Sequence, residues 1–343
     1  MKIGIIGRFA YGKDLLDGQT IKTRILREEL IKRLPDSKVS YVDVYKFKLR
    51  FIFVFIKIFI LFARNKKIIV LLSKNGRRII FPYMHFLNKI FKREMYHDVI
   101  GGMLTNDLDG NPKRKKYFLS FSEHWVETKK MKTQLKEYGV ENVDVIPNFK
   151  SLTPIDAKDV YSSNKFSFCT FSRVTKSKGI SLAIETISKL NEKTGCSATL
   201  DVYGEIDKNY LEEFNELLEK HKDFVFYKGK VHYNQSVDTL KNYYMLLFPT
   251  THDGEGFPGT IIDAFFAGVP VVATDWRYNS EILTNGFTGI IYDYRKEDAF
   301  YETLVYCIEN KELINNMRHN CLEEAKKYSV DELMNIIINK LKG

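Results

Sequence analysis

The chain has 343 residues, of which 44% are hydrophobic and 28% are charged; this balance excludes a largely disordered protein and predicts two domains of ordinary size. Lys and Arg number 53 against 43 Asp and Glu, a net charge of +10. The excess lies in residues 1–150, which hold 31 basic and 15 acidic residues, whereas the rest of the chain holds 22 and 28. Such one-sided charge indicates an anionic partner for the first half, either a membrane surface or a nucleic acid.

The sequence of the first half predicts alternating strands and helices. Residues 2–7 form a short apolar run typical of a buried strand rather than of a signal peptide, and a helix is expected over residues 20–34, ended by Pro35. A strongly apolar helix is expected over residues 47–62. Further strands are expected at 38–45, 67–72, 95–100, 117–122 and 143–147. This alternation is typical of an α/β domain with a doubly wound sheet.

The second half repeats the same pattern. The polar residues 151–164 are interpreted as a linker, so the expected domains are residues 1–155 and 156–343. For the last helix two positions are left open: it packs in the second domain, or it crosses back to the first. Strands are expected at 167–171, 198–203, 224–227, 245–248 and 270–273. Two doubly wound domains that face each other would place the ends of their strands, and hence their ligand loops, along a shared cleft.

The segment DGEGFPGTIIDAFFAGVPVVA, residues 253–273, leads from a strand through a glycine-rich loop into a helix that starts near Gly259. The free amides of a helix start favour an anion. Glu255 and Asp263 are eight positions apart and can face one ligand, and carboxylates beside a phosphate site suit sugar hydroxyls. The alternative is that Glu255 caps the helix and Asp263 lies on a solvated face.

A second loop, SRVTKSKG at residues 172–179, also joins an apolar strand to an amphipathic helix. Its Arg173 and Lys178 can stabilise the charge that a diphosphate gains as its bond to a sugar breaks. The alternative is a solvated basic loop.

Together these two loops resemble the retaining glycosyltransferases of family four, which have the GT-B fold and include enzymes of bacterial surface polysaccharide synthesis. The family pattern is G-R-x-x-x-x-K-G followed by E-x7-E. The matching residues here are Arg173, Lys178, Gly179, Glu255 and Asp263. The sequence departs from the pattern at Ser172, which replaces the first glycine, at Asp263, which replaces Glu, and at Pro258, which has no amide to offer.

The resemblance implies that Arg173 and Lys178 bind the donor diphosphate, that Glu255 and the amides after it hold the hexose, and that Asp263 binds the ribose hydroxyls. It also implies retention of the anomeric configuration, no required metal, and no cofactor apart from a nucleoside diphosphate sugar as co-substrate. The remaining donor-binding candidates are Gly18, Gln19, Thr20, Gly204, Val231, Gly256, Phe257, Gly259 and Thr260. For Gly18–Thr20 a plain helix start is the alternative, and for Gly204 a plain turn.

Two other features are not assigned a catalytic role. Asp107-Leu108-Asp109 has the D-x-D form used by metal-dependent glycosyltransferases of another fold, but it adjoins Gly110, Asn111 and Pro112 and is interpreted as a turn. His97 is interpreted as a packed core residue. No P-loop or G-x-G-x-x-G run occurs, so the sequence supports neither a P-loop NTPase nor an ordinary dehydrogenase.

The expected location is the cytoplasmic face of the plasma membrane, with peripheral attachment through residues 51–63, FIFVFIKIFILFA. This run is too short and too charged to span a bilayer. The alternative is a buried domain helix. The expected partners are a nucleotide-sugar donor, a glycan or lipid-linked acceptor and an anionic membrane surface. Two rival functions remain open: a nucleotide-sugar epimerase, and a nucleic-acid-binding protein that uses the basic residues 113–116.

Overall fold

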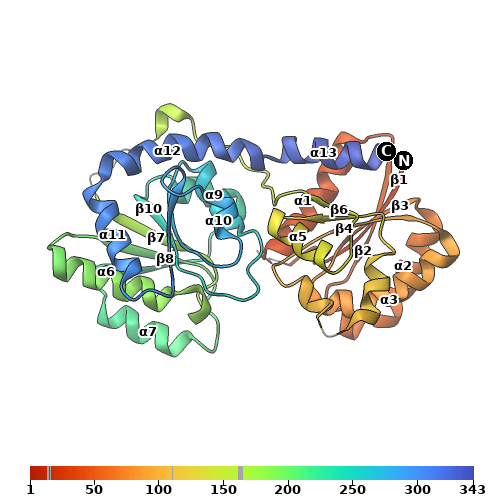
Figure 1. Ribbon diagram of the computed structural model, residues 1–343, viewed down its shortest axis with the longest axis horizontal. Coiled ribbons are helices and arrows are strands. Elements are labelled where there is room, and N and C mark those ends of the chain that lie inside the picture. The colour runs from red at the N-terminus through yellow and green to blue at the C-terminus, as the bar shows by residue number, and fades with distance from the viewer. Residues whose placement is uncertain (14, 16, 110, 161–164) are drawn as a thin grey trace. The chain divides into compact units, whose positions relative to one another are not determined.

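The computed structural model describes residues 1–13, 15, 17–109, 111–160 and 165–343 (Figure 1). The chain forms two compact units. Unit 1 comprises residues 1–149 and 330–343, and unit 2 comprises residues 150–329. The boundary lies between Phe149 and Lys150, earlier than the expected one after residue 155, and the last helix belongs to unit 1. Residues 161–164 of the expected linker lie outside the described residues.

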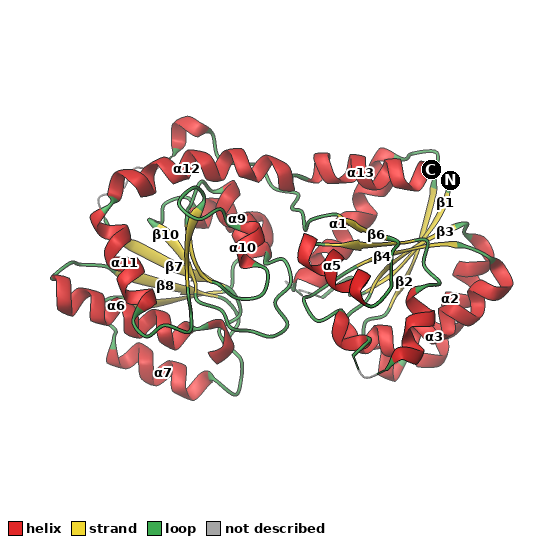
Figure 2. Cartoon of the chain, in the orientation of Figure 1, coloured by secondary structure: helices red, strands yellow, loops and turns green. Residues whose placement is uncertain are grey.

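Unit 1 is built around a six-stranded parallel sheet in the order β2-β1-β3-β4-β5-β6. Its strands are β1 (Lys2–Gly7), β2 (Lys38–Asp43), β3 (Lys67–Leu71), β4 (Glu94–Asp98), β5 (Glu123–Val126) and β6 (Val143–Val145). Its helices are α1 (Gly18–Arg33), α2 (Phe51–Arg64), α3 (Lys74–Phe91), α4 (Lys115–Phe118), α5 (Lys129–Glu137) and α13 (Val330–Lys342). Figure 2 shows helices on both faces of this sheet, and for that reason its inner strands β1 and β3 are nearly continuous apolar runs.

One face of this sheet packs against the two ends of the chain. Ile3 and Ile5 of β1 share a buried cluster with Leu26 of α1 and with Met334 and Ile337 of α13. Successive residues of a strand point to opposite faces, so the intervening residues of β1 face the side on which α2 packs. The last helix therefore completes the core of the first unit.

The prediction of a strand over residues 117–122 is wrong. This run contains the end of α4 and a turn, and the strand follows it at Glu123–Val126. Phe118 and Phe121 are both buried and both contact the ring of Phe81. Side chains three positions apart share a side in a helical turn but not in a strand, and a short apolar run does not distinguish the two.

Unit 2 contains a second six-stranded parallel sheet in the order β12-β11-β10-β7-β8-β9. Its strands are β7 (Ser167–Phe171), β8 (Thr199–Tyr203), β9 (Val225–Gly229), β10 (Met245–Phe248), β11 (Val271–Thr274) and β12 (Gly289–Tyr292). Its helices are α6 (Ile180–Thr194), α7 (Leu211–Lys220), α8 (Ser236–Leu240), α9 (Gly259–Phe266), α10 (Asn279–Ile282), α11 (Ala299–Glu309) and α12 (Lys311–Ala325). Strand β12 was not expected from the sequence.

The strand order of unit 2 reverses between β7 and β10. Strands β8 and β9 continue outward on one side of β7, and β11 and β12 continue outward on the other side of β10. The loops that leave β7 and β10 therefore diverge, and a crevice at such a point is the usual ligand position in an open α/β sheet. Both donor loops expected from the sequence start here.

Candidate functional site

The loop after β7 and the loop after β10 are held together by their backbones. The amide of Thr251 donates to the carbonyl of Ser177 (2.9 Å). Gly179, between the first loop and α6, has φ +73°, and a Cβ there would overlap the carbonyl oxygen of Pro249. Only glycine accommodates both this conformation and this close approach without strain. The glycine of the expected pattern therefore fixes the spacing of the two loops.

Lys178 and Glu255 form a buried ion pair between these loops. Glu255 also accepts a hydrogen bond from Thr250 Oγ1 (3.1 Å), and the ammonium of Lys178 lies 5.2 Å from the ring centre of Phe248. The structure thus joins the two motifs in one cluster. Glu255 does not cap α9, because the N-cap residue is Pro258 and no side chain bonds to it. The alternative of a helix cap is wrong.

Arg173 contrasts with Lys178, although both belong to the same loop. Its side chain is exposed, and no hydrogen bond or ion pair joins its guanidinium to another described residue. The solvated-loop alternative therefore fits Arg173 but not Lys178. An unpaired guanidinium next to a buried Lys–Glu pair leaves one cation of the loop free to meet an anionic ligand.

The start of α9 provides the amides expected of an anion site. The helix begins at Gly259, and in its first turn only the amide of Ile261 is bonded to a backbone carbonyl of a described residue, that of Pro258. Gly256 and Phe257 are buried just before it. Thr260 Oγ1 is buried and has no hydrogen-bond partner among the described residues. Backbone and hydroxyl donors are thus concentrated at a helix N-terminus, which favours a phosphate or sugar oxygen.

Asp263 is buried, which rules out the solvated-face alternative. Its two oxygens accept from Lys150 Nζ (3.0 Å) and Ser236 Oγ (3.0 Å). Burial raises the pKa of this carboxyl, although Lys150 and Ser236 oppose the shift. Both oxygens thus have protein partners, and Asp263 and Glu255 share no hydrogen-bond partner within the part of the chain that the structure describes. Binding of ribose by Asp263 stays a prediction.

The remaining candidates of unit 2 lie in the loops after β8 and β9. Gly204 has φ +137°, and a Cβ there would overlap the carbonyl oxygen of Ser172. Its amide donates to the carbonyl of Gly229 (2.8 Å). Val231 is half-buried in the next loop. Gly204 therefore serves the close packing of three successive loops, whatever it does for a ligand.

His252 is a residue that the sequence reasoning missed. Its Nδ1 lies 3.3 Å from Ser177 Oγ, and its carbonyl accepts from Trp276 Nε1 (2.9 Å). Burial, and next the charge of Lys178, lower the pKa of this imidazole, so it is neutral at pH 7. The signal in the sequence was its position three residues before Glu255. Lys150 and Ser236, far from Asp263 along the chain, gave no such signal.

Gly18, Gln19 and Thr20 lie in unit 1 at the start of α1, as the helix-start alternative states. Asp17 is the N-cap and accepts from the amide of Thr20 (3.1 Å). The hydroxyl of Thr20 donates to Asp17 (2.9 Å), and Gln19 Nε2 donates to the carbonyl of Leu71 (3.2 Å). Gly18 is exposed. The side chain of Thr20 thus bonds within the helix start and that of Gln19 to the end of β3, and donor binding by these residues stays a prediction.

Asp107 and Asp109 have structural partners. Arg77 Nε donates to Asp107 (2.6 Å) in a buried ion pair, and the hydroxyl of Tyr138 donates to Asp109. Among the described residues no group of three or more His, Cys, Asp or Glu side chains is placed to hold a metal ion. Gly110, part of the expected turn, lies outside the described residues.

His97 is packed in the core of unit 1, as expected. Its Nδ1 lies 3.0 Å from Nδ1 of His124, and both rings are fully buried. Burial lowers the pKa of His124 to about 4 and lowers that of His97 well below the ordinary value. Both rings are therefore neutral in the folded protein at pH 5, where the unfolded chain binds a proton on each.

This pair predicts acid sensitivity of unit 1. A histidine whose pKa is lowered by folding contributes stability above its unfolded pKa, and the contribution falls as the pH drops toward the folded pKa. Between pH 7 and pH 5, we expect His124 alone to lower the free energy of unfolding by about 2 kcal/mol. Urea unfolding at pH 7 and at pH 5 measures this change in the free energy of unfolding. His124→Gln should reduce the pH dependence, whereas exposed His319→Gln should not; an unchanged slope in His124→Gln contradicts the assignment.

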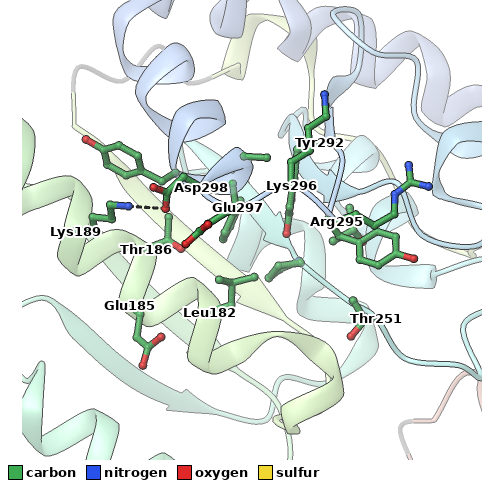
Figure 3. Close-up of a pocket in the computed structure, with 16 residues that line it drawn as sticks. Leu182, Glu185, Thr186, Lys189, Thr251, Tyr292, Arg295, Lys296, Glu297 and Asp298 are labelled. Carbon is green, nitrogen blue, oxygen red and sulfur yellow. Dashed lines mark hydrogen bonds and ion pairs between the residues drawn. The ribbon is translucent and has the colours of Figure 1, made fainter.

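Unit 2 also contains a hollow of about 560 Å³ (Figure 3). Side chains of α6, the ends of β10, β11 and β12, and the start of α11 line it. An ion pair between Lys189 and Asp298 (2.5 Å) closes one side. Arg173, Lys178, Glu255 and Asp263 are not among the lining residues, but Pro249 and Thr251 of the loop after β10 are, so the hollow borders this loop without containing the four charged side chains.

The sequence of unit 2 decides the family. The model of the family described as glycosyl transferases group 1 matches residues 153–328, half of the chain. The chain belongs to the group 1 glycosyl transferases. The family match coincides with unit 2, so the loops after β7 and β10 lie within the part of the chain that defines the family.

Curated relatives of this glycosyl transferase are distant and longer. The GtfA subunit of the UDP-N-acetylglucosamine–peptide N-acetylglucosaminyltransferase of Streptococcus agalactiae is 26% identical over 196 residues, which cover 54% of this chain and 38% of that protein. The chain thus spans about four tenths of the length of that relative.

Solved structures show the fold over the whole chain. HepE of Anabaena, solved with UDP, has a TM-score of 0.77 at 15% identity, with 100% of both chains covered. The pneumococcal O-GlcNAc transferase GtfA, solved with UDP and GlcNAc, has a TM-score of 0.65 at 18% identity and covers 83% of this chain and 58% of its own. This glycosyl transferase has the GT-B fold, with two Rossmann-like domains, as expected from its sequence.

Proposed function

We propose that this protein transfers a hexose-type sugar from a nucleoside diphosphate sugar to a glycan or lipid-linked acceptor, with retention of the anomeric configuration. The observation that carries the proposal is the contact between Lys178 and Glu255 at the β7–β10 switch point, beside the free amides at the start of α9. It unites the two motifs that resemble family four. The loop also presents an exposed, unpaired Arg173.

The chemistry follows from the charges of this cluster. As the bond between sugar C1 and the diphosphate oxygen breaks, negative charge develops on the leaving diphosphate. Arg173, Lys178 and the amides near Gly259 supply positive potential for this charge, and groups fixed before the reaction stabilise the transition state more than the ground state. Glu255 then accepts hydrogen bonds from the sugar hydroxyls. We propose that no metal is required, because these cations and amides serve the leaving group.

A uridine donor is the first choice to test. HepE was solved with UDP and with UDP-glucose, and GtfA with UDP and GlcNAc. We propose a role in the synthesis of a bacterial surface polysaccharide, in the cytoplasm at the inner face of the plasma membrane. The basic first half supports a position near an anionic surface.

The test combines binding and turnover. Thermal unfolding is measured with UDP, GDP and UMP, because a ligand that binds the folded state raises the apparent stability by mass action. We expect UDP to raise the melting temperature more than UMP, since the second phosphate meets Arg173 and Lys178. UDP release from UDP-glucose and UDP-GlcNAc is then followed, with and without oligosaccharide acceptors, and should persist in EDTA.

Three outcomes count against parts of the proposal. If neither UDP nor GDP raises the melting temperature, the donor does not bind at this cluster. Activity lost in EDTA and restored only by manganese or magnesium would contradict metal independence. Conversion of the donor sugar to an epimer, without transfer, would favour the epimerase.

A further inference from the structure

Two helices of unit 1 expose an unusual number of large apolar side chains. These side chains belong to α2, to the two residues before it, and to α3. Each of the residues exposes more than a third of its surface to solvent. The residues are Leu49, Phe51, Ile52, Phe53, Ile56, Phe59 and Ile60, together with Ile79, Phe86 and Ile90. We call them the α2–α3 surface. Phe53 is 67% exposed and Phe86 is 58% exposed, so these side chains are not packing residues of the core.

The α2–α3 surface is continuous because the two helices pack side by side (Figure 1). The rings of Phe55 and Tyr83 are 4.5 Å apart, and those of Phe59 and Phe91 are 5.4 Å apart. The hydroxyl of Tyr83 donates to the carbonyl of Phe55 (3.2 Å). The exposed stripe of α3 therefore borders the exposed side of α2 rather than forming a separate patch.

Helix α2 has a buried side as well. Val54, Ile58, Leu61 and Phe62 are buried and recur at the spacing of one helix face. One face of α2 therefore packs in the domain, as the alternative of a buried domain helix states, and the other face is exposed. Large contiguous apolar patches are rare on monomeric proteins and mark a contact with a partner or a membrane.

The charges around the surface identify the partner. Residues 44–93 contain 13 Lys and Arg and no Asp or Glu. Lys57 and Arg64 are exposed on α2, and Arg78 and Lys89 are exposed on α3; none of the four forms an ion pair with a described residue. An apolar face on two helices that carry basic side chains and no acidic ones is complementary to a surface that is apolar inside and anionic outside.

We propose that the α2–α3 surface docks on an anionic lipid bilayer, with the exposed rings of α2 and α3 at the boundary between headgroups and acyl chains and the basic side chains at lipid phosphates. No helix among the described residues is long and apolar enough to cross a membrane, so both helices lie along the bilayer. A second copy of the chain is disfavoured, because a two-fold contact would bring this surface against its own like charges.

The experiment is co-sedimentation of the full chain with vesicles of phosphatidylcholine alone and with one third phosphatidylglycerol, at low and high salt. We expect binding to the anionic vesicles, weakened by salt because exposed charges are screened. Phe53→Glu/Ile56→Glu should reduce binding to anionic vesicles by roughly tenfold or more, and Lys57→Glu/Lys89→Glu by a similar factor. Circular dichroism and thermal unfolding confirm that the exposed substitutions leave the fold intact.

Matched controls come from unit 2, where Phe287 is an exposed ring and Lys208 and Lys220 are exposed cations. Phe287→Glu and Lys208→Glu/Lys220→Glu should bind anionic vesicles as the unchanged protein does. Absence of vesicle binding at low salt overturns the proposal, as does equal binding by the α2 variant. A stable dimer in light scattering that Phe53→Glu/Ile56→Glu dissociates would instead assign the surface to a second copy. UDP binding, measured on the same samples, reports separately on the proposed function.

Discussion

Arg173→Ala is expected to lower kcat/KM for sugar transfer by about a hundredfold or more, because it removes the cation that we propose to meet the departing diphosphate. Arg173 is exposed and has no ion-pair partner among the described residues. The variant should therefore unfold at the same temperature as the unchanged protein. Steady-state measurement of UDP release and of transfer product, beside a thermal unfolding curve, checks both statements.

Lys176 provides a matched control in the same loop. Its side chain is exposed, and its ion pair with Glu213 (3.1 Å) lies on the surface, where such pairs contribute little. Lys176→Ala should retain nearly full transfer. Equal losses in Lys176→Ala and Arg173→Ala would mean that the loop acts through its overall charge, and near-normal transfer in Arg173→Ala would falsify the diphosphate assignment.

Lys178→Ala is expected to lose transfer as well, but for two reasons. It removes a cation from the cluster and leaves Glu255 buried without its ammonium partner, which costs stability. Glu255→Gln keeps the size of the side chain and the hydrogen bond from Thr250, but it leaves Lys178 buried without its carboxylate partner. It should also damage transfer, because the proposed sugar contact loses its charge. A thermal unfolding curve for each variant separates loss of fold from loss of chemistry.

Lys22→Met is expected to destabilise the protein by about 3–5 kcal/mol, the usual cost of removing one partner from a buried ion pair. The ammonium of Lys22 donates to Asp98 (2.8 Å) and Glu127 (3.1 Å), and all three side chains are buried. The two carboxylates raise the pKa of Lys22 above its ordinary value despite burial. The variant leaves their negative charge in the interior of unit 1 without this cation.

Urea unfolding of both proteins measures this loss. Lys32→Met is the control, because Lys32 lies on the same helix but is exposed and 3.9 Å from Glu29; it should change the free energy of unfolding by less than about 0.5 kcal/mol. A Lys22→Met protein as stable as the control would show that the buried pair contributes nothing net. Folding raises the pKa of Lys22, so the side chain stays charged in the folded protein even above its pKa in the unfolded chain. The contribution of the ion pair to the free energy of unfolding should therefore be constant across neutral pH and disappear only in strong alkali.

The sequence determined the class of fold and the position of the two loops that follow β7 and β10. Short apolar runs separated by loops and amphipathic segments specify parallel strands with helical crossovers, and glycines and charges directly after such strands fall at the carboxyl edge of a sheet whatever its strand order. For this reason Arg173, Lys178, Glu255 and the start of α9 were all located without a structure. Local pattern carried this information, because each motif lies within one strand–loop–helix unit.

Only the tertiary structure decided which side chains meet and which face of each helix is covered. Lys178 and Glu255 are 77 positions apart, and Lys150 and Asp263 are 113 apart, so their pairing depends on strand order. Apolar residues surround helix α2 on most of its sides, and composition cannot distinguish the stripe that packs on the sheet from the rings left in solvent. Residues 117–122 became a helical turn because Phe118 and Phe121 both pack on Phe81, a contact between segments that periodicity does not encode.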